Sequence, residues 1–154
     1  MKTNTFLKPW LLIAFSLLCW SSLSAEDLKW LTDYKKAAAQ AEKENKLLLM
    51  DFTGSDWCPP CKILHEQFFG AEEFKAFAKK NLVLLELDFP FHKELPPKLK
   101  EQNDSLAAKY KIGGYPTVIV LGKSDKILSK TEGLPRKGLA GFMDDLEKAK
   151  SKNE

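Results

Sequence analysis

The sequence predicts an α/β fold, because segments typical of strands and of helices alternate along the chain. Residues 47–52 and 82–87 form two short, mostly apolar runs of the kind found in strands that are buried on both faces of a sheet. Apolar residues at helical spacing lie between these runs. A β-branched run over residues 117–121 predicts a further strand.

The first 25 residues have the pattern of a secretory signal peptide. Two lysines precede an apolar run, and small and polar residues follow it up to Ala25. We predict cleavage after Ala25 and one domain over residues 26–154, located in the periplasm or secreted. The alternative is an uncleaved N-terminal segment that anchors the chain in a membrane, although its apolar run is short for a spanning helix.

Net charge and cysteine content limit the classes of partner that the protein can have and the disulfides that it can form. Removal of residues 1–25, with two lysines and no acidic residue, lowers the formal net charge from +3 to +1, which points to neither nucleic acid nor an anionic membrane. Of the three cysteines, Cys19 falls in the predicted signal peptide, so the exported chain keeps Cys58 and Cys61 as its one possible disulfide. We expect no bound cofactor and no metal.

Cys58 and Cys61 flank Pro59 and Pro60 behind the first apolar run. Positions three apart on the first turn of a helix share a face, so the two cysteines can form a disulfide. Cys58 would lie exposed at the helix N-terminus, where free N–H groups and the helix dipole favour a thiolate, and Cys61 would lie one turn deeper. Pro60 suits a first turn, but Pro59 removes a further N–H donor. We therefore expect only modest thiolate stabilisation.

Other uses of a cysteine pair fit this chain less well. Structural zinc needs four ligands, and only His65 and His92 could join the cysteines. Haem attachment needs a histidine where Lys62 stands. A purely structural disulfide would close too short a loop to stabilise the chain much. Redox chemistry is the leading hypothesis, with metal binding through Cys58 and Cys61 as an alternative.

The remaining elements follow from local patterns. A helix capped by Thr32 or Asp33 ends near Asn45, and the turn at residues 54–56 leads into the cysteine helix. Apolar spacing in that helix continues to Phe69, and a further helical stretch ends before Asn81.

The C-terminal half begins with an irregular segment. Three prolines and two phenylalanines predict a loop over residues 88–97, followed by a helix over about 105–110. A turn at residues 122–125 joins the β-branched strand to a second strand that runs through Ser129. The last helix covers about 135–150.

This order of elements resembles the thioredoxin fold over most of residues 28–150. The motifs that carry the resemblance are Asp51-Phe52 ahead of the Trp57 to Lys62 segment, then Gly114-Tyr115-Pro116-Thr117, and Gly133. Residues 51–58 look most like those of exported bacterial thioredoxin-like proteins with a CPPC site. The resemblance implies a mixed sheet of four to five strands flanked by helices on both faces. It also implies an extracytoplasmic protein-disulfide oxidoreductase.

The resemblance assigns roles to three buried or helical residues. It implies that Cys58 attacks a substrate disulfide and that Cys61 resolves the mixed disulfide. Asp51 would help to move the Cys61 proton, since burial in an apolar strand raises the pKa of a carboxyl. Leu84 stands where the family has a buried lysine, so Asp51 would lack that charge partner. We interpret His65 as a residue of the helix surface.

Substrate contact is expected around a proline. The resemblance implies that Pro116 is cis, faces the dithiol and exposes the Tyr115 backbone to an extended substrate segment. Trp57 and Tyr115 would flank the sulfurs. The expected substrate-binding residues are Trp57, Pro59, Pro60, Tyr115 and Pro116.

The partners would be protein thiols and disulfides. Electrons would come from a membrane thiol relay, because the chain has no flavin or nicotinamide site, and we expect a monomer. The modest thiolate stabilisation favours a reductase over an oxidase. The alternatives are a redox-inert module that binds peptides and a metal-binding protein.

Overall fold

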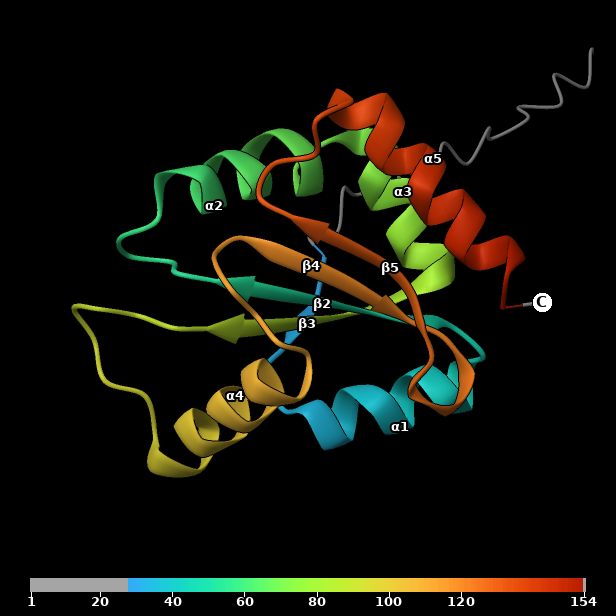
Figure 1. Ribbon diagram of the computed structural model, residues 1–154. Helices are drawn as coiled ribbons and strands as arrows, with labels where there is room; N and C mark the ends of the chain where they lie inside the picture. The colour runs from blue at the N-terminus through green and yellow to red at the C-terminus, as the bar shows by residue number, and fades with distance from the viewer. Residues whose placement is uncertain (1–27, 154) are drawn as a thin grey trace, which may run out of the picture.

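A computed structural model describes residues 28–153 and shows a five-stranded mixed sheet between two layers of helices (Figure 1). The strand order is β1-β3-β2-β4-β5. The first three of these strands run parallel to one another, whereas β4 is antiparallel to β2 and to β5. The strands are β1 (Trp30–Leu31), β2 (Leu47–Thr53), β3 (Leu82–Asp88), β4 (Thr117–Leu121) and β5 (Ile127–Glu132). The predicted fold class is confirmed.

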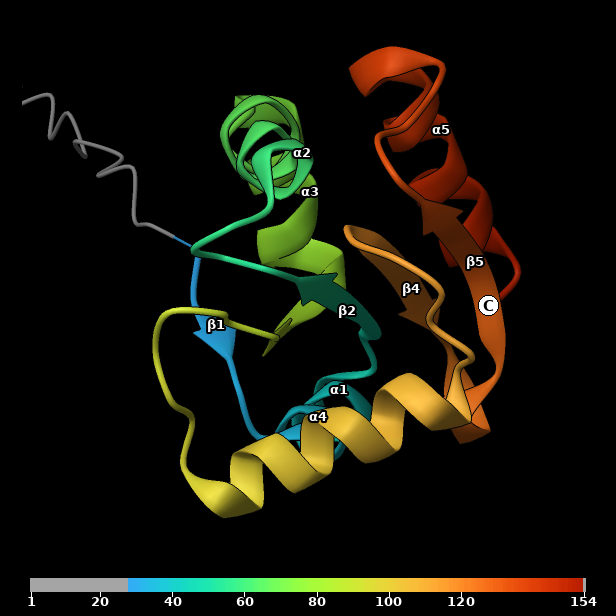
Figure 2. The ribbon, with the colours of Figure 1, turned by 60° about the vertical axis from the view of Figure 1, so that its left-hand side comes forward.

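The helices divide between the two faces of the sheet (Figures 1 and 2). One face carries α1 (Tyr34–Glu44) and α4 (Pro97–Lys109). The other carries α2 (Pro59–Ile63), which continues as the π-helix η1 (Leu64–Phe69), then α3 (Glu72–Asn81) and α5 (Gly138–Ser151). A 3-10 turn, η2 (Lys123–Asp125), lies between β4 and β5.

The central strand β2 is buried along its whole length, and its side chains alternate between two apolar cores. Leu47 and Leu49 pack with α3, η1 and α5. Leu48, Met50 and Phe52 pack with α1 and α4. By this alternation Asp51 shares the face of Leu47 and Leu49, so its carboxylate points toward the helical layer that carries the cysteines.

The first helix follows its sequence signals. The Asp33 side chain accepts a hydrogen bond from the Lys36 N–H at 3.0 Å and caps α1, and Asn45 ends the helix in the left-handed conformation with φ 51°.

Four features differ from the sequence-based expectations. The helix α4 begins at Pro97 instead of near residue 105, because the missing N–H of a proline costs nothing in a first helical turn. The strand β5 continues to Glu132, beyond Ser129. The last helix begins at Gly138 instead of near residue 135. The two-residue strand β1 was not predicted, since so short a segment shows no period.

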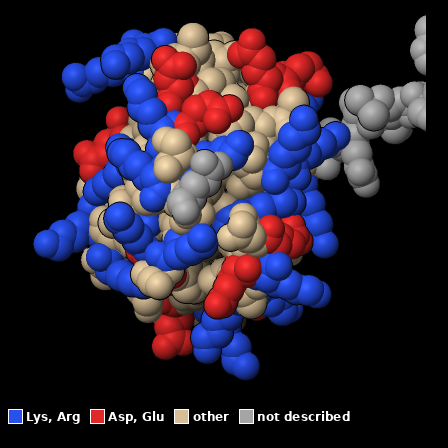
Figure 3. Space-filling model, turned by 90° about the vertical axis from the view of Figure 1, so that its right-hand side faces the viewer, with Lys and Arg blue, Asp and Glu red and all other residues tan. Residues whose placement is uncertain are grey.

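The predicted signal peptide, with its cleavage after Ala25 and with Cys19, lies outside the described residues. Within residues 28–153, none of the helices has the length and apolar character needed to span a membrane. Lysines are prominent on the face at the right of Figure 1, but acidic side chains are interspersed among them (Figure 3).

Candidate active site

Cys58 and Cys61 form a disulfide at the amino end of α2, with their Cα atoms 5.3 Å apart. Cys58 is the N-cap residue of this helix, and its Sγ accepts a hydrogen bond from the Cys61 N–H at 3.3 Å. The two residues are only 2% and 1% exposed. The expected difference in exposure is therefore wrong for the oxidised protein, since each sulfur of a closed disulfide helps to cover the other.

The two prolines limit the donors around the Cys58 sulfur. Pro59 and Pro60 occupy the first two helical positions and have no N–H to offer. The Lys62 N–H bonds to the Cys58 carbonyl oxygen at 3.3 Å. The Cys61 N–H thus remains as the first-turn donor that reaches the sulfur.

The Tyr115–Pro116 peptide bond is cis, as the resemblance implied. Pro116 is buried and Tyr115 is half-buried at the start of β4. The Tyr115 ring meets the Trp57 ring edge-on, with their centroids 5.8 Å apart. This contact places the proline loop beside the turn that carries Cys58.

An aromatic surface adjoins the disulfide. Trp57 is 43% exposed, and its Nε1 donates a hydrogen bond to the Phe89 carbonyl oxygen at 2.8 Å. The Phe89 ring lies 5.0 Å from that of Tyr115, and Phe91 in the same loop is 80% exposed. The sequence named Trp57 and Tyr115 and placed Phe89 and Phe91 in an irregular segment, but it gave no signal that this segment packs against Trp57 and Tyr115.

The loop over residues 89–96 is fastened to the cysteine turn. The Asp56 carboxylate accepts hydrogen bonds from the backbone N–H groups of Phe91 and His92, at 2.9 and 2.7 Å. The exposed Phe91 is therefore held close to the disulfide helix by its own backbone.

Asp51 is fully buried, and its Oδ2 lies 2.8 Å from Nε2 of His65. Its Oδ1 has no hydrogen-bond partner among the described residues. Burial raises the pKa of Asp51, and the bond to His65 acts in the opposite direction. Leu84 belongs to the apolar core, so Asp51 has no lysine partner at that position. His65 supplies a different partner from the helical layer.

His65 is half-buried instead of lying on the helix surface, so its interpretation from sequence is wrong. Its ring lies 5.5 Å from that of Trp30 and 5.1 Å from that of Phe69. Burial acts to lower the pKa of His65, but the bond to Asp51 and the charges of Asp51 and Glu86 outweigh it and raise this pKa. The signal that could have found His65 is its position four residues after Cys61, one helical turn away.

Cys61, His65 and Glu86 line one hollow of about 220 Å³. The Glu86 carboxylate lies 4.0 Å from His65 Nε2, and burial raises its pKa. Cys61 and His65, the hydrogen-bond partner of Asp51, therefore adjoin the same small opening.

Comparison with known proteins agrees with this geometry. Residues 29–123 match the family described as thioredoxin-like. The chain belongs to the thioredoxin-like family. This thioredoxin-like protein is 32% identical over 118 residues to the disulfide bond reductase DsbH of Chlamydia pneumoniae, covering 77% of this chain and 70% of that protein.

Two further comparisons support the assignment. The thioredoxin-related protein DsbJ of Chlamydia pneumoniae is 27% identical over 102 residues, which is 66% of this chain and 29% of DsbJ. A solved structure of a DsbH oxidoreductase superposes with a TM-score of 0.74 and 30% identity, over 83% of this chain and 88% of that one. Family, fold and disulfide together confirm the predicted enzyme class, a protein-disulfide oxidoreductase.

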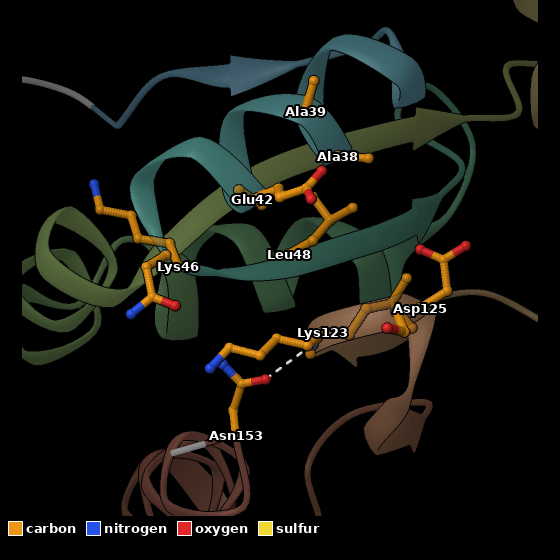
Figure 4. A pocket seen from close by; sticks show the side chains of 13 residues that line it. Ala38, Ala39, Glu42, Lys46, Leu48, Lys123, Asp125 and Asn153 are labelled. Atoms are coloured by element: carbon orange, nitrogen blue, oxygen red, sulfur yellow. Dashed lines mark hydrogen bonds between the residues drawn. The ribbon is translucent and has the colours of Figure 1, made fainter.

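Another hollow, of about 530 Å³, lies between α1 and η2 at the opposite end of β2 (Figure 4). Lys123 donates its backbone N–H to Asn153 Oδ1 there, at 2.9 Å. No cysteine or histidine lines this hollow, so it is separate from the redox site of the thioredoxin-like protein. Over residues 28–153, no group of three His, Cys, Asp or Glu side chains is placed to hold a metal ion.

Proposed function

We propose that this oxidoreductase reduces disulfides in other proteins outside the cytoplasm, through the Cys58–Cys61 pair. The observation that carries the proposal is the disulfide itself, which lies at a helix N-terminus beside a cis-proline and an exposed tryptophan. A dithiol in this position can attack a partner disulfide and then close again.

The reaction uses the two cysteines in turn. In the reduced protein the Cys58 thiolate, favoured by its N-cap position, attacks one sulfur of a substrate disulfide and forms a mixed disulfide. Cys61 then gives its proton to Asp51, and its thiolate attacks Cys58 Sγ. The second substrate thiol leaves, the Cys58–Cys61 bond closes, and two electrons have passed to the substrate.

Substrate binding is assigned to the surface around the disulfide. An extended segment of the substrate would pair with the backbone of Tyr115 next to Pro116, as a peptide adds to the edge of a sheet. Trp57, Pro59 and Pro60 would contact it on the other side of the sulfurs, since Trp57 and Pro59 are exposed and Pro60 is half-buried.

Two observations favour reduction over oxidation. Strongly oxidising members of this superfamily have a highly stabilised reduced form. Here Pro59 and Pro60 remove two of the N–H groups that could stabilise a Cys58 thiolate, so the reduced form gains less. In addition, the relative from Chlamydia pneumoniae is named a disulfide bond reductase.

We also propose a location outside the cytoplasm. The signal-peptide pattern of residues 1–25, together with two relatives named as Dsb proteins, supports export of the domain over residues 26–154. An exported reductase needs electrons from inside the cell, so a membrane thiol relay is the proposed donor. We propose that the protein acts as a monomer on thiols and disulfides of exported proteins.

The first test is the reduction potential of the Cys58–Cys61 pair in dithiothreitol or glutathione buffers. We expect a value near that of thioredoxin, about −270 mV, and a value near about −120 mV would instead indicate a disulfide donor. Failure of the pair to form a disulfide at all would overturn the redox function.

Two matched variants test the order of attack. Reduced Cys61→Ser is expected to accumulate a mixed disulfide with oxidised insulin, because Cys58 can attack an insulin disulfide but the resolving thiol is gone. Cys58→Ser is expected to form none and to lose insulin reduction. Full function in Cys58→Ser would instead indicate a redox-inert binding module.

A further inference from the structure

We propose that His65 is a positioning residue that keeps the buried Asp51 ionised and so sets the pH range in which Cys61 can give up its proton. The inference rests on the proposed function, because it concerns the step in which Cys61 resolves the mixed disulfide. It adds a residue that lies outside the two cysteines and the buried carboxyl.

The two oxygens of Asp51 are in different situations. His65 Nε2 is hydrogen-bonded to Oδ2 at 2.8 Å, whereas Oδ1 is buried and has no hydrogen-bond partner among residues 28–153. A buried carboxylate oxygen without a donor is costly unless it has a use. Oδ1 is therefore the oxygen that is free to accept a proton from the resolving thiol.

The placement of His65 suits a link to Cys61. Cys61 and His65 are one turn apart on the same helix, and both line the hollow of about 220 Å³. Asp51 reaches the same layer from β2, since its side chain alternates with those of the opposite core.

The charges around His65 favour its protonated form. From the sheet it faces Asp51 on β2 and, at longer range, Glu86 and Asp88 on β3, so three carboxyl groups act on one imidazole. The charged residues of its own helix that line the hollow are Lys62 and Glu66, which carry opposite signs. A protonated His65 donates to Asp51 Oδ2 and offsets the cost of a buried carboxylate.

The proton step then balances without any further group. The Cys61 S–H bond breaks and an O–H bond forms at Asp51 Oδ1, while His65 keeps its own proton on Nε2. The electron pair left on Cys61 Sγ attacks Cys58 Sγ and expels the substrate thiolate, which takes a proton from solvent. When a donor thiol later reduces the disulfide, the leaving Cys61 thiolate takes the proton back from Asp51.

The test compares His65→Gln with His92→Gln, which removes the second histidine of the exported chain from the exposed loop. The pKa of Asp51 is read from its carboxyl carbon resonance in the reduced protein. Without His65 the effects of burial and of the Asp88 charge remain, and both raise this pKa. It is therefore expected to rise by about 1–3 units, and His92→Gln is expected to leave it unchanged. The variant His65→Lys restores a cation and is expected to reverse part of the rise.

The pH profile of insulin reduction gives the second readout. The acid limb of the profile, where activity falls as Asp51 becomes protonated, is expected to move to higher pH in His65→Gln by the same amount as the Asp51 pKa. Asp51→Asn should lack this limb, and the double variant should match Asp51→Asn. In Asp51→Asn the pKa of His65, read from its ring resonances, is expected to fall.

Two results separate the inference from the function on which it rests. An Asp51 titration that does not change in His65→Gln overturns the inference even when insulin reduction is normal. An acid limb that stays in place while the rate falls uniformly also overturns it, since that is the result of a purely structural role. Absence of insulin reduction in the wild-type protein counts against the proposed function. In that case the titration of Asp51 still decides whether His65 controls the charge of Asp51.

Discussion

The Asp88 carboxylate accepts two hydrogen bonds from Ser55, one from the backbone N–H at 2.9 Å and one from the hydroxyl at 2.7 Å. Asp88 ends β3, and Ser55 lies in the turn between β2 and the disulfide helix. Lys93 of the loop over residues 89–96 pairs with the same carboxylate at 2.9 Å. Burial acts to raise the pKa of Asp88, but these contacts hold it below its ordinary value. The Asp88 carboxylate thus joins the turn before the cysteine helix to the loop over residues 89–96.

Replacement of Asp88 by alanine is expected to destabilise the protein by about 1–3 kcal/mol, because the Ser55 N–H loses its buried partner. The control is Asp104→Ala, which removes an exposed carboxylate paired with Lys100 and should cost no more than about 0.5 kcal/mol. Urea unfolding at neutral pH measures both. Equal midpoints for the two variants would contradict the role given to Asp88.

The same contact predicts a dependence on acid. Because the folded pKa of Asp88 lies below its unfolded value, its stabilisation is present above the unfolded pKa and is lost as the pH falls through the folded value. The difference in unfolding free energy between wild type and Asp88→Ala should therefore shrink in acid. A difference that stays constant down to about pH 2 would count against a charged Asp88 in the fold.

Gly54 lies under the indole of Trp57, and a Cβ atom added to it would come within 2.6 Å of the ring. The clash involves a side chain that is 43% exposed, so in Gly54→Ala the ring is expected to swing outward instead of the backbone shifting. The bond from Trp57 to the Phe89 carbonyl would break, at a cost of about 1 kcal/mol. Red-shifted tryptophan emission and a lower unfolding midpoint would report it. Gly113→Ala is the control, since no atom lies within 4 Å of its Cβ position.

Phe91 is the most exposed large apolar residue near the disulfide, at 80%. If it contacts substrate proteins, Phe91→Ser should raise the KM for insulin about fivefold, the equivalent of about 1 kcal/mol of apolar contact, and leave kcat unchanged. Reduction of a small disulfide such as 5,5′-dithiobis(2-nitrobenzoic acid) should not change. Ile127→Ser, at an exposed position on β5, is the matched control. An equal loss with both disulfides would show that Phe91 supports the site structurally.

The parts of the fold that were predictable have local signals. The runs at β2 and β3 are apolar and short, and the turn between β2 and α2 is marked by Gly54, so the placement of the cysteine helix could be predicted from neighbouring residues. The start of α4 could not, because a proline-rich segment is compatible both with a loop and with a first helical turn. Asn103, a buried amide of α4 that donates to the Asp88 carbonyl oxygen at 2.9 Å, was hidden by the same error.

In the candidate site, too, some residues could be predicted from local motifs and others could not. The cysteines and Pro116 stand in motifs that can be recognised within a few residues. The partner of Asp51 depends instead on how a helix packs over a sheet, because His65 is 14 residues away in sequence. Periodicity places His65 on a turn with Cys61 but does not say which strand that turn covers. Such pairs become visible only when the layers are assembled.

The Asp51–His65 pair also predicts how stability depends on pH. The folded pKa values of both residues lie above their ordinary values of 3.8 and 6.5, so the folded protein binds protons more tightly than the unfolded chain. Their contribution to stability is therefore complete below these values and is lost as the pH rises through the folded pKa values. The oxidised wild-type protein should lose about 1 kcal/mol or more of unfolding free energy between about pH 5 and about pH 9.

Asp51→Asn separates this effect from the titration of other groups, because it removes one member of the pair and the main cause of the raised His65 pKa. Its unfolding free energy should fall less over the same interval, whereas the exposed-site control Asp104→Asn should follow the wild type. The oxidised form is used so that the cysteines do not titrate. If Asp51→Asn and wild type lose stability in parallel as the pH rises, then the folded protein does not hold the protons of the Asp51–His65 pair more tightly than the unfolded chain.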